Sequence, residues 1–90
     1  MDERFVTGYF AKSKAGHDAG SIYVILDSDE RFVYLSEGRL KTVDNPKRKK
    51  RKHLQLINER AEEVMAKLDK GLPITNEDIK RSIKLYNSRK

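Results

Sequence analysis

The sequence contains no cysteine and no tryptophan among its 90 residues. The absence of cysteine excludes a disulfide scaffold, a thiolate zinc site and a cysteine nucleophile. The longest uninterrupted apolar run covers only residues 22–26, far fewer than the roughly 20 residues that a membrane-spanning helix needs. The amino-terminal MDERF is charged and lacks the apolar stretch of a secretory signal, so we expect a soluble, intracellular protein without a membrane partner.

Sequence motifs of catalysis are also missing. There is no P-loop ending in GK[ST], no GxGxxG after a strand, no nucleophile elbow and no HExxH. The only histidines are His17 and His53, and neither has neighbouring residues that suggest a ligand set. A chain of this length buries about 60–65% of its unfolded surface, which leaves no second lobe to enclose a substrate cleft. We therefore expect no enzymatic activity, cofactor, metal or small-molecule substrate.

The first half of the chain has the alternating apolar pattern of short β-strands separated by polar turns. Residues 27–30 form an acidic stretch that we interpret as a solvated turn, facing away from any polyanion. Several short strands without intervening helices favour a small β-barrel over parallel βαβ units. We predict a barrel over residues 1–57 and a helical appendage over 58–90. The predicted strands cover residues 5–13, 22–26, 31–36, 40–43 and 53–57.

The second half changes to a helical period, with apolar residues that share one face. Asn58 is the predicted N-cap of a first helix, and Gly71 is predicted to end it. Thr75 is predicted to begin a second helix, with Asp78 placed for a capping box. We expect the two apolar stripes to pack on each other or on the barrel, unless a partner protein uses that face. The stripes contain Ile57, Ala61, Val64, Met65 and Leu68, then Ile79, Ile83 and Tyr86.

The positive charge is concentrated in one short block. The formal net charge is +6, and residues 46–53 alone carry +6, whereas residues 1–45 carry −2 and residues 54–90 carry +2. Neighbouring cations repel one another and have no local carboxylate, so we interpret the block as a basic loop that binds a polyanion. Arginine engages phosphate in a bidentate way, and lysine acts as a point charge. The cations are Lys47, Arg48, Lys49, Lys50, Arg51 and Lys52.

A second candidate segment is the glycine-containing loop after the first predicted strand. Gly16 and Gly20 permit positive φ and a close approach of the backbone to a sugar-phosphate chain. Lys12 and Lys14 flank the loop and are candidates for phosphate contacts. His17 lies in the middle of the loop, where it is a candidate for stacking on RNA or for a hydrogen bond to it.

Five other side chains receive simpler interpretations. Phe10 and Phe32 are predicted in the core of the barrel. Tyr9 and Tyr23 fall on the opposite alternation, so they are candidates for exposed platforms on which unpaired bases stack. Asp18 is predicted to accept hydrogen bonds from backbone amides of its own turn.

The loop and its flanking strand carry a family resemblance. The stretch G-Y-F-A-K-S-K-A-G-H-D-A-G resembles the KOW motif. More narrowly, the chain resembles small KOW-domain proteins related to the large-subunit ribosomal protein L fourteen-e, whose opening reads G-x-V-x-x-S-x-A-G-x-D-x-G. The basic block followed by His53 and Leu54 stands where that family has a basic run and a closing strand. Phe10 departs from the usual valine but keeps its apolar character. The matching positions are Gly8, Phe10, Ser13, Ala15, Gly16, Asp18 and Gly20.

The resemblance implies an SH3-like β-barrel of about five strands that binds ribosomal RNA. It covers residues 5–57, and the helices match only in general shape. It implies a cytoplasmic ribonucleoprotein component of translation that docks on structured large-subunit rRNA, with ribosomal proteins as further partners of the helices. Two alternatives remain open: a protein-interaction module of the transcription or translation machinery, and a DNA-binding or nuclear protein whose PKRKKRK is an import signal. The RNA-binding candidates are Lys12, Lys14, Gly16, His17, Gly20, Lys47, Arg48, Lys49, Lys50, Arg51, Lys52 and His53.

Overall fold

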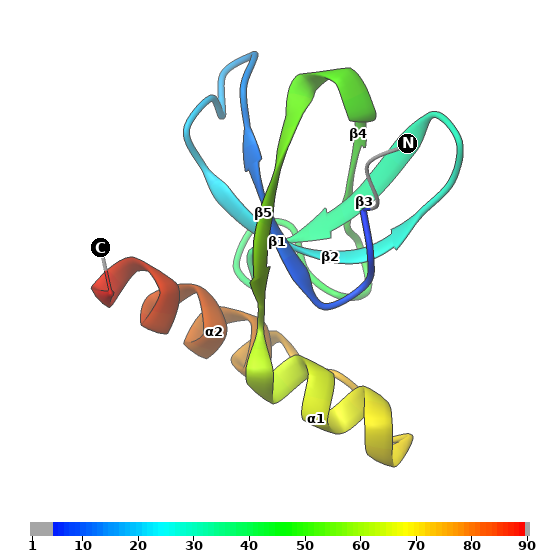
Figure 1. Ribbon diagram of the computed structural model, residues 1–90, viewed down its shortest axis with the longest axis vertical. Coiled ribbons are helices and arrows are strands. Elements are labelled where there is room, and N and C mark those ends of the chain that lie inside the picture. Colours follow the sequence, from blue (N-terminus) through cyan, green and yellow to red (C-terminus); the bar gives the residue numbers. More distant parts are fainter. Residues whose placement is uncertain (1–4, 90) are drawn as a thin grey trace.

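The computed structural model describes residues 5–89 of the chain. Its five strands form one antiparallel sheet in the order β4-β3-β2-β1-β5. The sheet curls into a barrel-like shape, and both helices lie at one end of it (Figure 1). The predicted α+β class, a small barrel-like sheet followed by two helices, is confirmed. The elements are β1 (Tyr9–Ser13), β2 (Ile22–Ser28), β3 (Phe32–Ser36), β4 (Lys47–Lys50), a 3₁₀ helix (Arg51–His53), β5 (Leu54–Arg60), α1 (Glu62–Lys70) and α2 (Asn76–Ser88).

The apolar run of strand β2 is continuous because both faces of this strand are buried. Tyr23 and Ile25 point into the curl of the sheet, where they belong to an inner core. Val24 points the opposite way into a second, outer core that lies against the helices. The inner core contains Phe5, Ala11, Tyr23, Ile25, Val33, Leu35 and Leu54. The outer core contains Phe10, Val24, Ala61, Val64, Ile79 and Tyr86.

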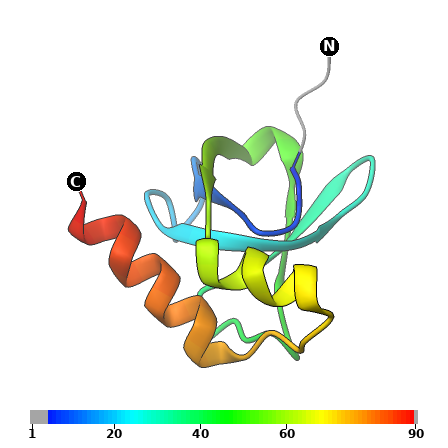
Figure 2. The ribbon, with the colours of Figure 1, turned by 60° about the horizontal axis from the view of Figure 1, so that its bottom comes forward.

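The helices cover the outer face of the sheet through this second core (Figure 2). The rings of Phe10 in β1 and Tyr86 in α2 meet with centroids 4.9 Å apart. Val64 and Ile79 are fully buried, so the predicted stripes pack both on each other and on the sheet. Leu68, also predicted in the stripe, is 40% exposed because it lies in the last turns of α1. Neither helix within the described residues is long and apolar enough to cross a membrane.

The helix ends agree with the sequence prediction at two of the three predicted positions. Gly71 ends α1 in the left-handed conformation, with φ +70°. Thr75 caps α2, and its hydroxyl and the Asp78 carboxylate form the predicted capping box. The predicted start of the first helix at Asn58 is wrong, because β5 continues to Arg60 and extends three residues beyond the predicted end of the barrel. The ladder between β1 and β5 holds residues 57–60 extended, and the N–H of Ala61 then donates to the carbonyl of Gly8.

Two predicted segments between β3 and β5 are also wrong. Residues 40–43 form no strand; their turn is organised by Glu37, whose carboxylate accepts the backbone N–H groups of Arg39, Leu40 and Lys41. The edge strand is instead β4, which lies in the block predicted as a basic loop over residues 46–53. Strand β4 pairs with β3 from Phe32↔Lys50 to Leu35↔Lys47. The ladder of backbone hydrogen bonds therefore outweighs the repulsion between neighbouring cations.

Candidate nucleic-acid interface

The two segments that the sequence predicted as binding elements lie together at one end of the barrel. The 3₁₀ helix after β4 and the loop between β1 and β2 both project at the end opposite the helices (Figure 1). The backbone N–H of Lys14 in the loop donates to the carbonyl of His53, at 2.8 Å. Ser13 pairs with Leu54 immediately beyond that contact. Backbone hydrogen bonds therefore fix the loop beside the basic block.

The strand geometry of β4 divides its cations between two faces of the sheet. Lys49 lies opposite Val33 and Lys47 opposite Leu35, whose side chains belong to the inner core. The side chains of Lys49 and Lys47 are accordingly only 11% and 29% exposed. Arg48 alternates with them and is exposed on the outer face. Because side chains alternate along a strand, residues that look equivalent in the sequence have different environments.

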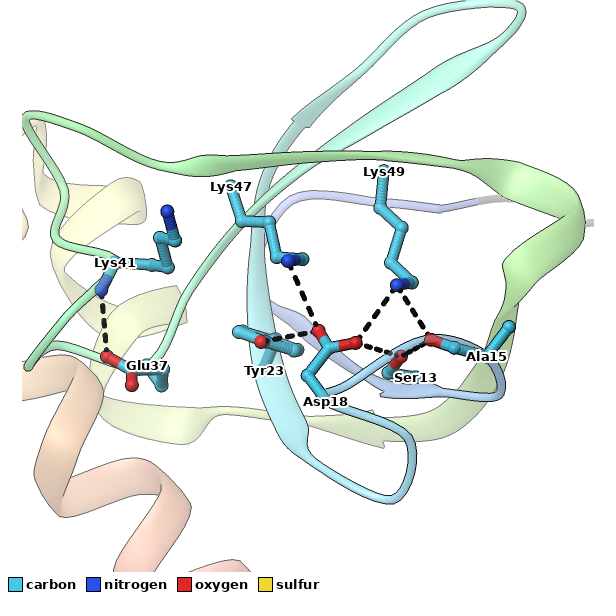
Figure 3. Close-up of polar contacts among 8 residues, drawn as sticks. All are labelled: Ser13, Ala15, Asp18, Tyr23, Glu37, Lys41, Lys47 and Lys49. Atoms are coloured by element: carbon cyan, nitrogen blue, oxygen red, sulfur yellow. Dashed lines mark hydrogen bonds and ion pairs between the residues drawn. The ribbon is translucent and has the colours of Figure 1, made fainter.

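The inward lysines converge on one carboxylate, that of Asp18 (Figure 3). Its Oδ1 accepts hydrogen bonds from Ser13 Oγ at 2.9 Å and from Lys49 Nζ at 3.0 Å. Its Oδ2 accepts one from Tyr23 OH at 2.7 Å and lies 3.6 Å from Lys47 Nζ. The prediction that Asp18 bonds backbone amides of its own turn is therefore wrong. The basic block has no carboxylate close to it in the sequence, but two of its six cations pair in space with Asp18, which lies 31 residues from Lys49.

The protonation states of this cluster follow from burial and hydrogen bonding. Burial by itself raises the pKa of Asp18, but hydrogen bonds from Tyr23, Lys49 and Ser13 outweigh it and hold the pKa well below its ordinary value. Burial, followed by the hydrogen bond to Asp18, raises the pKa of the Tyr23 hydroxyl. At neutral pH the carboxylate is thus ionised and the phenol remains a donor. The cluster is a fixed structural unit, and Lys49 extends it to the carbonyl of Ala15 at 3.0 Å.

The outward cations of the block have no such partner. Arg48, Lys50 and Lys52 are exposed, and within residues 5–89 none of them forms an ion pair with a carboxylate. Arg51 is different, because its Nε donates to the carbonyl of Asp29 at 2.8 Å and its guanidinium lies 5.3 Å from the centroid of the Phe5 ring. Lys50 and Lys52 are therefore directed at solvent, and Arg48 is exposed with its guanidinium 4.5 Å from the centroid of the Phe32 ring.

The loop residues have the geometry that the sequence predicted for the glycines. Gly16 and Gly20 have φ +87° and +94°, a conformation that other L-residues rarely adopt. A Cβ at Gly20 would meet no atom within 4 Å, so steric crowding does not require glycine there. The requirement comes from the backbone conformation alone. Lys12, Lys14 and His17 are all exposed.

The histidines do not form part of a metal site in the described part of the chain. His17 is exposed in the loop, and His53 is half-buried at the end of the 3₁₀ helix. Across residues 5–89, no three histidine, aspartate or glutamate side chains are grouped closely enough to hold a metal ion. The structural contribution of His53 is its carbonyl, which accepts the hydrogen bond from Lys14.

Three aromatic residues lie elsewhere than predicted. Tyr23 is 4% exposed and Tyr9 is half-buried against the inner core, so neither is an exposed platform. Phe32 was predicted in the core but lies half-buried on the outer face, with the Arg48 guanidinium 4.5 Å from its ring centroid. The strand alternation contained the signal, because Val33 and Leu35 occupy the inner face and leave Phe32 outside.

The acidic turn between β2 and β3 touches the basic block, although it was predicted to lie away from the interface. The Asp29 carboxylate accepts the backbone N–H groups of Arg31 at 2.9 Å and Phe32 at 2.8 Å. These hydrogen bonds, from Phe32 first, lower the pKa of Asp29. The carbonyl of Asp29 accepts the hydrogen bond from Arg51, which brings the turn beside the 3₁₀ helix. The carboxylate thus organises the hairpin turn instead of pairing with the outward cations.

Comparison with known proteins adds no family to this description. No protein-family model matches the chain, and a search of curated proteins finds no match to its sequence.

Proposed function

We propose that this protein is a non-catalytic RNA-binding protein of the ribosome or its associated factors, in the cytoplasm, that docks on structured ribosomal RNA. The observation that supports the proposal is the set of outward cations at one end of the barrel. Arg48, Lys50 and Lys52 lie on a strand and a helical turn, where backbone hydrogen bonds fix their positions. A fixed row of exposed cations, without a carboxylate partner among residues 5–89, costs self-repulsion in the free protein, and a polyphosphate removes that cost by binding.

The mechanism is electrostatic docking followed by a fit of shape. Each neutralised phosphate releases condensed counterions, so affinity falls steeply as salt increases. Lys12 and Lys14 are exposed, and the backbone of Lys14 is bonded to the 3₁₀ helix, so we expect both lysines to add phosphate contacts. Double-helical RNA offers shape and phosphates more than readable base edges, so we expect little sequence preference from these contacts.

The test is sedimentation of the tagged full chain with large ribosomal subunits at low salt. The proposal expects co-sedimentation that is lost when Arg48, Lys50 and Lys52 are all changed to alanine. A matched control removes the same charge from exposed cations elsewhere and should keep co-sedimentation. Equal loss in both variants would reduce the interaction to net charge and contradict the proposed site. The control changes Arg39, Lys70 and Lys84 to alanine.

A salt titration separates the proposal from its two alternatives. If five phosphates are contacted, affinity for a structured RNA should fall by about 100- to 500-fold between 50 and 200 mM salt. Binding that barely responds to salt would favour a protein partner with an apolar interface. Equal affinity for duplex DNA and structured RNA at one salt concentration would favour the DNA-binding alternative.

A further inference from the structure

A hollow of about 350 Å³ lies beside the outward cations, at the turn between β2 and β3. Its volume falls within the range of small-ligand sites. One aromatic residue and four cationic residues line it, so it combines an apolar residue with concentrated positive charge. The lining residues are Arg31, Phe32, Lys50, Arg51 and Lys52. We call this feature the Phe32 hollow.

Phe32 is positioned there by two independent contacts. Its backbone N–H donates to the Asp29 carboxylate, and its strand pairs it with Lys50. The Arg48 guanidinium covers the ring at 4.5 Å, yet Arg48 is not among the residues that line the hollow. Phe32 is half-buried and itself lines the hollow, so a flat group bound there would lie beside it.

We propose that the Phe32 hollow binds one unpaired nucleotide, whose base stacks on Phe32 and whose phosphate contacts Lys50 and Lys52. This inference rests on the proposed RNA-binding function and narrows its substrate to RNA with an unpaired or bulged nucleotide. A phosphate alone would leave the ring unused, and an apolar peptide would leave the cations unused. A nucleotide matches both, because it joins a π-surface to a negative charge.

Two acidic residues of the turn, Asp29 and Glu30, immediately precede the lining residues Arg31 and Phe32 in the sequence. Glu30 directly precedes Arg31 and is exposed, whereas the Asp29 carboxylate already accepts the N–H groups of Arg31 and Phe32 through Oδ1. The Tyr34 hydroxyl also donates to it, at 3.3 Å.

A base inside a continuous double helix is covered on both faces by its neighbours, so stacking on Phe32 requires a base outside the helix.

The test compares two RNAs of equal phosphate number, a fully paired duplex and a hairpin with a single-nucleotide bulge. The full-length protein should prefer the bulged RNA, and Phe32→Ala should reduce that affinity by about 5- to 150-fold, the range that stacking supplies per base. Affinity for the paired duplex should stay within about twofold, because phosphate contacts do not need the ring. Lys50→Ala should weaken both RNAs.

The outcomes separate this inference from the proposed function. If both RNAs bind equally and Phe32→Ala changes neither, the hollow takes no nucleotide, while docking through the cations still stands. If no RNA binds at low salt, both proposals fail. An abasic bulge that binds as tightly as the normal bulge would also overturn the stacking role.

A second variant keeps the test valid if Phe32→Ala disturbs the fold. The chain has no tryptophan, so Phe32→Trp places one fluorescent reporter at the hollow while keeping an aromatic ring. The bulged RNA should quench its emission, and the abasic version should leave it unchanged. A phosphotyrosine peptide that quenches emission and displaces the bulged RNA at equal concentration would identify a protein ligand and overturn the inference.

Discussion

Adjacent lysines of β4 should respond to substitution in opposite ways, because one points inward and the other outward. Lys49 donates to Asp18 and to the carbonyl of Ala15, and its side chain is only 11% exposed. Lys50 is exposed and forms no ion pair among the described residues. Methionine at either position removes one positive charge and keeps most of the side-chain volume, so Lys49→Met and Lys50→Met form a matched pair.

The expected magnitudes follow from these contacts. Loss of hydrogen bonds to charged partners costs about 1.5–3 kcal/mol, so Lys49→Met should lower Tm by about 6 to 24 °C. Lys50→Met should change the free energy of unfolding by less than about 0.5 kcal/mol. For RNA, losing one phosphate contact should lower the salt-dependence slope by about 0.7–0.9 and weaken binding by about 5- to 8-fold at 0.1 M salt. We expect this change of slope in Lys50→Met and an unchanged slope in Lys49→Met.

Thermal unfolding and a salt series of RNA-binding titrations measure the two effects in the same samples. The titrations should be made well below the Tm of Lys49→Met, so that both variants are folded. The reasoning is refuted if Lys49→Met keeps the wild-type Tm and loses as much slope as Lys50→Met. That result would mean that the block behaves as a flexible loop in which every cation reaches phosphate.

Three further substitutions test the structural contacts. Asp18→Asn should cost about 3 kcal/mol or more at pH 7, because it leaves the nearly buried Lys49 ammonium without a carboxylate. Because the pKa of Asp18 is lowered in the folded protein, its contribution to the free energy of unfolding is present above the unfolded pKa of about 4 and is lost as the pH falls below it. Urea titrations at pH 3 and pH 7 should therefore show that Asp18→Asn loses less stability in acid than the wild type. Equal losses in the two proteins would contradict this. Asp78→Ala should cost about 1–3 kcal/mol, because its carboxylate joins α1 to the cap of α2. Hydrogen bonds from Lys67 and Thr75 outweigh burial and lower the pKa of this carboxylate. Glu77→Ala, at an exposed position, is the control and should change the stability little in the same urea titration. Gly20→Ala should cost about 1–2 kcal/mol through backbone conformation alone, whereas Ala19→Ser at the exposed neighbouring position should be neutral by thermal unfolding.

Local patterns in the sequence predicted the elements whose stabilising contacts are close along the chain. The capping box at Thr75 and Asp78 spans three residues, and the end of α1 at Gly71 depends on one backbone conformation. Both were predicted correctly because propensity and capping act over a single turn. The continuous apolar run of β2 was also informative, since a strand buried on both faces needs no polar alternation.

The start of α1 was mispredicted because residues 57–60 are ambiguous on their own. Ile57 fits the helical stripe that continues to Ala61, but it also follows Leu54 and Leu56 at the end of a strand pattern. The pairing of β5 with β1 decides the matter, and its partner strand lies more than forty residues earlier. Tertiary hydrogen bonds thus override a local helical preference.

The strand structure of the basic block could not be predicted from neighbouring residues either, because its stabilising contacts are also distant along the chain. The block itself contains no acidic residue and the nearest one before it is Asp44, so repulsion between its cations predicts a solvated loop. Its carboxylate partner is Asp18, which is 31 residues away in the chain. The alternation of side chains along a strand would have divided the block correctly if β4 had been recognised as a strand. Phe32 was misplaced although the alternation within β3 puts Val33 and Leu35 on the inner face and leaves Phe32 on the outer face.

The inward and outward cations of β4 connect folding to binding in a way that can be measured. Lys49 holds both Asp18 and the Ala15 carbonyl, so it fixes the glycine loop relative to the strand that presents Arg48 and Lys50. Substitutions in the Asp18 cluster should therefore weaken RNA binding by loosening the surface, which lowers affinity while the salt slope stays constant. Substitutions of outward cations should lower affinity and slope together. A plot of affinity loss against slope loss should thus separate the variants into two groups, and a single line through all of them would contradict the division of the block between two faces.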